Sequence, residues 1–449
     1  MMPRWLLDRM VANADRPALV RGGGVLTYGG LLDRVAAWGT EFDRAGVGRG
    51  QVLAIDGDFT STAIGCLLAA MDRGAVVVPL TAAFGGAQRE EFLEIAQVAA
   101  TVTISEDDAW AMERRPGAGR DHPLLATLRE RGHPGLILFT SGSTGRNKAA
   151  LHDLHVLLEK FESPRSRMCT LTFLLLDHIG GLNTLFYTLA NGGTVVSVAG
   201  RDPDEILAAV ARHRVQLLPT TPSFLNLALL SGAFDRHDVS SLVRITYGTE
   251  VMPARTLERL RERLPGVDLL QTYGLTEVGI LRSKSKEAGS LLVRVGGEGY
   301  QTKVVDGILW VKARSAMLGY LNAPSPFDAD GWFCTQDAVE QEGEFLRILG
   351  RTTDIINVGG QKVYPGEVES VLLELANVRD ATVHGEPNAL LGQVVAARLN
   401  LLEPEPPAEL RRRVRAHCQD RLAAYKIPVR IEVAEQDPYN ARFKKLRRD

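Results

Sequence analysis

A nine-residue segment, Thr140 to Lys148, concentrates polar chemistry in one place. It reads Thr140-Ser141-Gly142-Ser143-Thr144-Gly145-Arg146-Asn147-Lys148 and directly follows the apolar run from Leu136 to Phe139. Its hydroxyls, glycines and cations suit an anion such as phosphate, because glycine lets backbone N–H groups approach closely. It is not a Walker A motif, since no Gly-Lys-Ser/Thr stands at the required spacing. The segment predicts a phosphate-binding loop after a strand, with a plain glycine- and serine-rich surface loop as the alternative.

Three further segments and one lysine carry chemistry later in the chain. They are Gln271-Thr272-Tyr273-Gly274-Leu275-Thr276-Glu277, Gly331-Trp332-Phe333-Cys334-Thr335-Gln336-Asp337, Gly350 to Glu367, and Lys444. With the first loop, and in this order, they resemble the motifs of the adenylate-forming superfamily of acyl-CoA synthetases, aryl acid ligases, luciferases and peptide-synthetase adenylation domains. The resemblance covers nearly the whole chain and is closest to acyl-CoA synthetases, which are AMP-dependent acid–thiol ligases.

The resemblance implies an enzyme that activates a carboxylic acid with ATP. The acid would form an acyl-adenylate with release of pyrophosphate, and the acyl group would then pass to a pantetheine thiol of CoA or of an acyl or peptidyl carrier protein. Charge builds up on the phosphoryl oxygens in the first step, so cations, donors and a metal ion are needed. The implied cofactors are ATP, Mg²⁺ and CoA or phosphopantetheine.

The resemblance also assigns roles around the nucleotide. The β- and γ-phosphates would be held by Thr140, Ser141, Gly142, Ser143, Thr144, Gly145 and Lys148. In the second segment, which also brings Gly274 to the nucleotide, Tyr273 would lie against the adenine ring and Thr276 would donate to the α-phosphate. Glu277 would coordinate Mg²⁺, a hard cation that favours carboxylate oxygens.

Two motif residues depart from the family pattern. Asp337 would accept hydrogen bonds from both ribose hydroxyls, with Arg351 bracing the ribose or a phosphate. Relatives usually carry glycine before this aspartate, but Gln336 stands here, and a side chain there would crowd the ribose or shift the turn. Lys444 would reach the substrate carboxylate and the α-phosphate, although Phe443 replaces the usual preceding glycine.

Lys445, next to Lys444, is the competing assignment for this lysine, and a solvated lysine-rich tail is a further alternative. Gly359 and Gly360 resemble the loop that lines the pantetheine tunnel when the thioester forms; a turn between two strands is the other interpretation. The hinge for the swing of the small domain would lie at Thr353, which is a third departure because relatives commonly carry Asp or Lys there.

The acyl side of the site is indicated by His178, which follows the apolar run Phe173 to Leu176 and would border the acyl pocket. It stands about where amino-acid-activating relatives carry an aspartate, which argues against an α-amino acid, although the neighbouring Asp177 weakens that inference. Tyr247 and Gly248 would form other walls of the acyl and adenine pockets, with plain core packing equally open for Tyr247.

Short apolar runs alternate with amphipathic helical stretches along most of the chain. Predicted buried strands are Val52 to Ile55, Ala75 to Val78, Thr194 to Val198 and Val215 to Leu218, with helices such as Ser61 to Arg73 and Glu205 to Arg214 between them. This alternation predicts an α/β fold with mainly parallel sheets. We expect a large N-terminal domain (1–350) of two α/β layered subdomains with a β-rich part at about 289–349, and a small mobile C-terminal α+β domain (351–449).

The bulk composition excludes several classes of protein. The 449 residues are 45% hydrophobic and 24% charged with a net charge of −2, which gives no electrostatic case for nucleic acid or an anionic membrane. Four scattered cysteines without a CxxC spacing predict reduced thiols, and no signal peptide or membrane span is evident. We therefore expect a cytoplasmic protein.

Two other functions stay open from the sequence. One is adenylation with an amine acceptor, or of an inorganic anion such as nitrite. The other is a non-catalytic family member that binds nucleotide. The departures at Gln336, Thr353 and Phe443 motivate both, and neither the acid nor the oligomeric state follows from the sequence.

Overall fold

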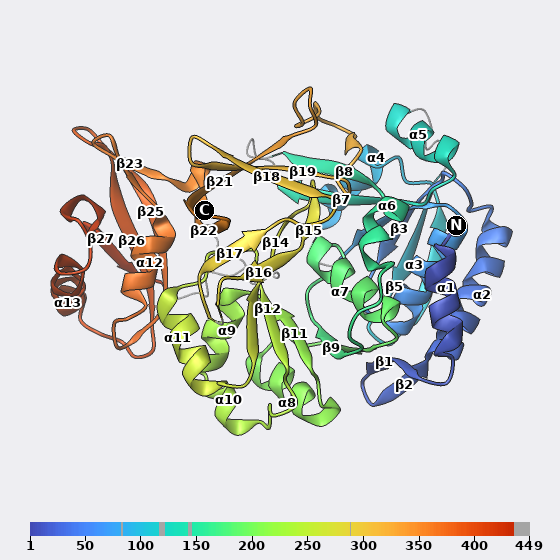
Figure 1. The fold of residues 1–449 in the computed structure, drawn as a ribbon, viewed down its shortest axis with the longest axis horizontal. Helices are drawn as coiled ribbons and strands as arrows, with labels where there is room; N and C mark the ends of the chain where they lie inside the picture. Colours follow the sequence, from blue (N-terminus) through green and yellow to red (C-terminus); the bar gives the residue numbers. More distant parts are fainter. Residues whose placement is uncertain (82–83, 116–121, 142–145, 288, 435–449) are drawn as a thin grey trace.

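The computed structural model describes residues 1–81, 84–115, 122–141, 146–287 and 289–434. Within these ranges the chain forms two seven-stranded sheets, a six-stranded sheet, a two-stranded ribbon and a five-stranded sheet. The last of these lies in a small C-terminal domain at one end of the molecule (Figure 1). The predicted α/β fold class, with a large N-terminal and a smaller C-terminal domain, is confirmed. The domain boundary at residue 350 stays a prediction.

The first seven-stranded sheet has the order β13-β12-β11-β9-β10-β1-β2, parallel except for β2. Its strands are β1 (Pro17–Arg21), β2 (Gly24–Thr27), β9 (Cys169–Thr172), β10 (Thr194–Ser197), β11 (Leu217–Thr220), β12 (Arg244–Tyr247) and β13 (Asp268–Gln271). Its helices are α1 (Arg4–Ala12), α7 (Ile179–Ala190), α8 (Pro203–His213), α9 (Pro222–Leu230), α10 (Ala233–Arg236) and α11 (Ala254–Arg263).

The second seven-stranded sheet has the order β20-β8-β7-β4-β3-β5-β6, with a parallel centre and antiparallel edges. Its strands are β3 (Val52–Asp56), β4 (Val76–Leu80), β5 (Ala100–Ile104), β6 (Trp110–Arg114), β7 (Gly135–Ser141), β8 (Asn147–Asp153) and β20 (Gly319–Tyr320). Its helices are α2 (Tyr28–Ala45), α3 (Ser61–Asp72), α4 (Gly86–Ile95), α5 (Pro123–Arg131) and α6 (Leu154–Leu158).

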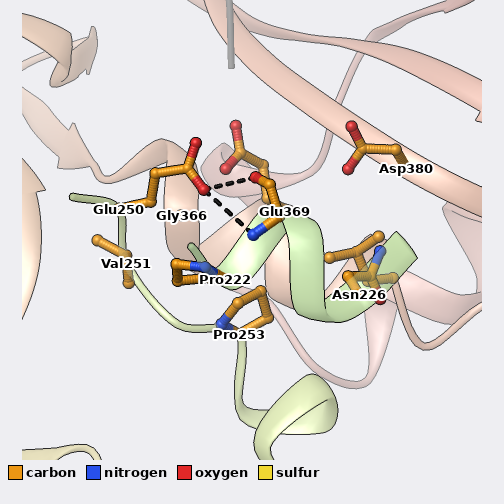
Figure 2. A pocket seen from close by; sticks show the side chains of 10 residues that line it. Pro222, Asn226, Glu250, Val251, Pro253, Gly366, Glu369 and Asp380 are labelled. Carbon is orange, nitrogen blue, oxygen red and sulfur yellow. Dashed lines mark hydrogen bonds between the residues drawn. The ribbon is translucent and has the colours of Figure 1, made fainter. Parts of the chain in front are cut away.

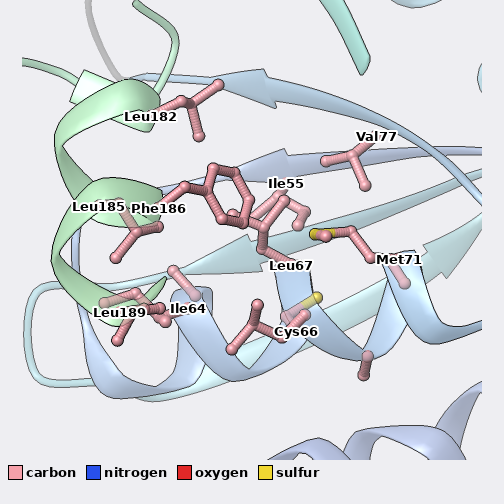
Figure 3. Close-up of a cluster of buried hydrophobic side chains, with 14 of the residues drawn as sticks. Ile55, Ile64, Cys66, Leu67, Met71, Val77, Leu182, Leu185, Phe186 and Leu189 are labelled. Atoms are coloured by element: carbon pink, nitrogen blue, oxygen red, sulfur yellow. The ribbon is translucent and has the colours of Figure 1, made fainter. Parts of the chain in front are cut away.

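The main hydrophobic core joins these two layers. Figure 3 shows α3 and α7 packed side by side over β3 and β4, with Leu67 and Phe186 at the centre of the contact. Both residues are almost completely buried. Helix α3 begins where predicted because the side chain of Thr60 accepts a hydrogen bond from the backbone N–H of Ala63 at 3.1 Å. Helix α7 begins directly after His178, and its buried face belongs to the same core.

The β-rich part follows the second motif. The ribbon is β14 (Tyr273–Leu275) and β15 (Gly279–Leu281). The six-stranded sheet contains β16 (Ser283–Ser285), β17 (Leu292–Val295), β18 (Tyr300–Val305), β19 (Ile308–Ala313), β21 (Phe333–Glu342) and β22 (Phe345–Arg351). Strands β21 and β22 pair so that Asp337 lies opposite Arg351, which places two predicted site residues side by side.

The small domain has its own core. Its elements are β23 (Ile356–Val358), β24 (Gln361–Val363), α12 (Pro365–Leu372), β25 (Val378–Asn388), β26 (Gly392–Leu401), α13 (Pro407–Gln419) and β27 (Arg430–Val433). Three short 3₁₀ helices complete the described elements: η1 (Glu159–Phe161), η2 (Thr352–Asp354) and η3 (Ala424–Lys426). No helix in the described parts of the chain is long and apolar enough to cross a membrane.

Candidate active site

The predicted phosphate loop joins β7 to β8. These strands are antiparallel, and Thr140 lies opposite Lys148 at the mouth of the loop. The ammonium of Lys148 lies over the ring of Tyr320, 5.1 Å from its centroid. Gly142, Ser143, Thr144 and Gly145 lie outside the described residues, as does the side chain of Ser141.

Glu277 is brought to this loop by Tyr320, a residue that the sequence had not indicated. The hydroxyl of Tyr320 donates a 2.7 Å hydrogen bond to Oε1 of Glu277, and the backbone N–H of Met317 donates to the Glu277 carbonyl at 2.8 Å. Burial, and next the charge of Glu277, raises the pKa of Tyr320 above its usual value. The Oε2 atom of Glu277 has no hydrogen-bond partner among the described residues, so it is available to a cation.

His152 lies beneath the same motif and was also missed from the sequence. Its side chain is fully buried on β8, and its ring nitrogens make no hydrogen bond of good geometry with the residues that the structure describes. Burial lowers its pKa to about 4, although the backbone of Thr276 and of Ser315 partly opposes this shift. The imidazole is therefore neutral at physiological pH and packs against the backbone that carries Thr276.

Tyr273, Asp337 and Arg351 form a second polar group. The Tyr273 hydroxyl donates to Oδ2 of Asp337 at 2.5 Å, and Nε of Arg351 lies 3.0 Å from Oδ1. Burial, with the Asp337 charge next, raises the pKa of Tyr273 well above its usual value. A carboxylate accepts about four hydrogen bonds, which suits Asp337 chemically to donors such as ribose hydroxyls.

Gln336 has a positive φ of 61°, the left-handed region that favours glycine. Its side chain points into solvent, so no packing in the described structure compensates the backbone conformation. This left-handed backbone conformation explains why relatives usually carry glycine immediately before the aspartate. The expectation that the Gln336 side chain would crowd the ribose stays untested.

Two glycines of the predicted nucleotide site allow close backbone contacts. A Cβ on Gly248 would lie 2.7 Å from the carbonyl oxygen of Thr272, and one on Gly274 would lie 2.9 Å from that of Gly279. Tyr247, next to Gly248, is fully buried in the core with Phe224. Burial raises the pKa of Tyr247, and its hydroxyl has no hydrogen-bond partner among the described residues.

His178 caps the N-terminus of α7. Its Nδ1 accepts a hydrogen bond from the backbone N–H of Gly180 at 3.0 Å, which fixes the orientation of the ring. The neighbouring Asp177 is buried, and the hydroxyl of Thr81 donates to its Oδ2 at 3.4 Å. A capping imidazole at a helix start can serve as a polar wall of an adjacent pocket.

The structure does not bring Gly359 and Gly360 to the nucleotide residues. They form the exposed turn between β23 and β24, with φ values of 56° and 86°. This is the turn between two strands that the sequence left as an alternative. In Figure 1, α12 is the helix of the small domain that faces the large domain. Lys444 and Lys445 lie outside the described residues.

The contact between the domains encloses a cavity (Figure 2). Helix α9 contacts β25, where Nδ2 of Asn226 donates to the Arg379 carbonyl at 3.2 Å. Helix α12 contacts the start of α11, where the backbone N–H of Ala254 donates to the Ser370 hydroxyl at 3.3 Å. The cavity of about 20 Å³ has room for about one water molecule, so it is too small for a nucleotide.

Comparisons with known proteins agree with this architecture. The AMP-binding enzyme family matches residues 7–321, and the AMP-binding enzyme C-terminal domain matches residues 367–444. The chain therefore belongs to the family of AMP-binding enzymes. The predicted adenylate-forming superfamily and the predicted class of enzyme, an AMP-forming acid–thiol ligase, are confirmed.

Similar curated proteins carry the names of CoA ligases. A 2-succinylbenzoate–CoA ligase of Bacillus pumilus is 29% identical over 98% of this chain and 95% of its own length. An indoleacetate–CoA ligase of Aromatoleum aromaticum is 31% identical over 76% of this chain and 68% of its own length. The crystal structure of an anthranilate CoA ligase with anthranoyl-AMP has a TM-score of 0.85 at 21% identity, and it covers 98% of this chain and 94% of that one, which supports the fold.

Proposed function

We propose that this chain activates a carboxylic acid with ATP and transfers the acyl group to CoA. The observation that carries this proposal is the chain of contacts from Lys148 through Tyr320 to Glu277, together with the Asp337–Arg351 pair on β21 and β22. A cation, a free carboxylate oxygen and a ribose acceptor are the groups that a nucleotide-dependent transfer needs. The CoA-ligase names of the relatives support CoA as the acceptor.

In the first step, an oxygen of the acid attacks the α-phosphorus of ATP. The bond from that phosphorus to the bridging oxygen breaks, and pyrophosphate leaves with the electron pair. Thr140 and Lys148 would hold the departing pyrophosphate, together with Ser141 and the loop residues Gly142, Ser143, Thr144 and Gly145. Thr276 would donate to the α-phosphate, and Lys444 would bring its charge to the reacting oxygens.

The nucleoside would lie between the two polar groups. Asp337 and Arg351 would hold the ribose, and the glycine contacts at Gly248 and Gly274 would shape the adenine pocket beside Tyr247 and Tyr273. His178 would border the acyl chain. Because these residues come from different sheets, their positions depend on the packing of the large domain as a whole.

The residues present fit a magnesium ion carried by the nucleotide. Mg²⁺ is usually bound through one or two carboxylates together with substrate phosphates, and Glu277 presents an oxygen without a hydrogen-bond partner among the described residues. When bound, the ion would neutralise charge on the phosphate oxygens. Tyr320 would keep the Glu277 carboxylate turned toward it.

In the second step, the thiol sulfur attacks the acyl carbonyl carbon. The bond from this carbon to the phosphate oxygen breaks, AMP leaves, and the thiol proton is released. Gly359 and Gly360 would line the thiol entrance, which requires the small domain to rotate from its present position. The 3₁₀ turn η2, which includes Thr353, would absorb that rotation.

The proposal also covers the thiol that accepts the acyl group and the cellular compartment of the enzyme. We place the enzyme in the cytoplasm, where its four free cysteines would stay reduced. A carrier protein is the alternative thiol donor, and the exposed Arg411, Arg412 and Arg415 on α13 would be its contact surface. Arg413 is not part of that surface because it pairs with Glu405 at 2.6 Å.

A pyrophosphate-exchange screen tests the proposed function. The purified enzyme is given Mg-ATP, labelled pyrophosphate and single acids from aryl, short-chain and long-chain groups, including 2-succinylbenzoate and indoleacetate. Acid-dependent label in ATP supports the proposal, and added CoA should then yield an acyl-CoA. Tight ATP binding without exchange for any acid would instead support a non-catalytic binding protein.

A further inference from the structure

Three cations that the sequence analysis did not single out gather beside α7. Lys160 lies in η1, Arg165 follows in the next loop, and Arg282 directly follows β15. We call these three residues the basic cluster. Lys160 and Arg282 are half-buried, and Arg165 is exposed at the rim.

Lys160 is held by neutral groups alone. Its ammonium donates to the side-chain oxygen of Asn183 on α7 and, at 3.0 Å, to the carbonyl oxygen of Ile280 on β15. It also lies 5.0 Å from the centroid of the Phe161 ring. An ammonium has three N–H donors, so one is left without a protein acceptor among the described residues.

Arg165 and Arg282 add two positive charges that no anionic side chain among the described residues balances. Nε of Arg282 is buried and makes no hydrogen bond with the described residues, and neither guanidinium has an ion pair among them. The nearby Glu159 is already paired with Arg314 at 2.8 Å. Burial, and then Arg165 and Arg282, lowers the pKa of Lys160 to about 7. Half-buried charges of one sign are costly unless an anion joins them.

The basic cluster shares two elements with the candidate active site. Asn183 lies five residues after His178, the N-cap of α7, which corresponds to about 7.5 Å along the helix axis and about 140° around it. Ile280 is the cross-strand partner of Gly274. The link to the nucleotide motif is thus the β14–β15 ribbon, because the Lys160 ammonium bonds the carbonyl of the residue opposite Gly274. An acid whose reacting carboxylate lies near the nucleotide would reach Lys160 along this ribbon.

We propose that the basic cluster binds a second carboxylate of the substrate, so that this enzyme activates a dicarboxylic acid. One carboxylate reacts with ATP, and the other accepts from Lys160 and from Nε of Arg282 without taking part in bond formation. A carboxylate has two oxygens for these two donors, and hydrogen bonds between opposite charges are the stronger kind. The inference rests on the proposed function.

Matched acids test the inference in the wild-type enzyme. Isophthalate is compared with benzoate, and suberate with octanoate, by pyrophosphate exchange. We expect the dicarboxylate of a pair that fits the pocket to have a kcat/KM about tenfold or more above its monocarboxylate partner. Equal or better exchange with both monocarboxylates would overturn the inference and leave the proposed function standing.

Variants then locate the effect. Lys160→Met and Arg282→Met keep the length of the side chain but remove its charge, so the dicarboxylate preference should fall toward one, mainly through KM. Lys284→Met is the matched control, because Lys284 is exposed two residues beyond Arg282 and should keep the preference. An unchanged preference in Lys160→Met and Arg282→Met would contradict the role of the cluster.

Calorimetric binding separates the two proposals. If no acid supports exchange, the proposed function fails, whereas isophthalate binding that exceeds benzoate binding and is lost in Lys160→Met would still support the anion site. If isophthalate binds no better than benzoate, the dicarboxylate inference is overturned. If a variant does not fold, the comparison of dicarboxylates with monocarboxylates in the wild-type enzyme decides whether the inference stands.

Discussion

The hydroxyl of Tyr320 donates a 2.7 Å hydrogen bond to the carboxylate of Glu277, and the ring of the same tyrosine lies under the ammonium of Lys148. Tyr320 is in β20, which pairs with β8 at the edge of the second large sheet. One side chain thus connects the proposed metal ligand to the proposed phosphate loop. Neither motif by itself predicts this connection.

Tyr320→Phe should weaken the use of Mg-ATP. Without its donor, Glu277 loses the partner that orients it, and loss of such a partner typically costs 10- to 100-fold in metal affinity or activity. We expect the apparent Mg²⁺ requirement of pyrophosphate exchange to rise about tenfold. Tyr425→Phe, in the small domain, serves as the control. An unchanged Mg²⁺ dependence would show that Tyr320 does not position Glu277.

Gln336→Gly should stabilise the protein. A left-handed backbone costs a residue with a side chain about 1–2 kcal/mol, and glycine would remove this cost. Part of the stability gained is offset because glycine has greater conformational freedom in the unfolded chain. We expect the free energy of unfolding to rise by about 1 kcal/mol in denaturant titrations. Gln336→Ala should bring no such gain, because alanine also has a Cβ. Equal stabilities of the glycine and alanine variants would refute the strain.

His152 should make the fold sensitive to acid. Its pKa is about 4 in the fold against about 6.5 in the unfolded chain, so the unfolded state binds more protons between these values. Stability is therefore lost as the pH falls from about 6.5 to about 4, by about 3 kcal/mol from this group. His152→Gln should lose less stability than the wild type over this window. Parallel pH profiles of the two proteins would contradict the assignment.

Lys444→Ala should separate the two half-reactions. We expect it to abolish formation of the adenylate, because the charge at the reacting oxygens is lost, and to leave thiolysis of preformed adenylate largely intact. Lys445→Ala tests the competing assignment and should leave adenylation in place. Loss of both half-reactions in Lys444→Ala would show that this lysine does not act in adenylation alone.

The elements were predictable where local signals were strong. The run Val52 to Ile55 became β3, and the helix predicted at Ser61 became α3, because a buried parallel strand and a capped helix leave clear patterns. The prediction at Val215 to Leu218 was displaced, since β11 spans Leu217–Thr220. Polar Thr220 extends the strand through its pairing with Tyr247, which a single-segment pattern does not reveal.

The site was predictable only in part. The motif around Asp337 indicated a polar acceptor, but not that Tyr273 and Arg351 would be its partners, because these contacts depend on how separate strands meet. Tyr320 and His152 belong to no motif that the sequence analysis used. Their roles follow from the pairing of β8 and β20 and from burial, which appear only in three dimensions.

The origin of the oxygen in AMP tests the central claim most directly. A substrate acid labelled with ¹⁸O in its carboxylate is turned over with Mg-ATP and CoA, and the AMP and pyrophosphate are analysed by mass spectrometry. If the carboxylate attacks the α-phosphorus, AMP carries one ¹⁸O and pyrophosphate carries none. Unlabelled AMP, or label in pyrophosphate, would contradict the formation of an acyl-adenylate at this site.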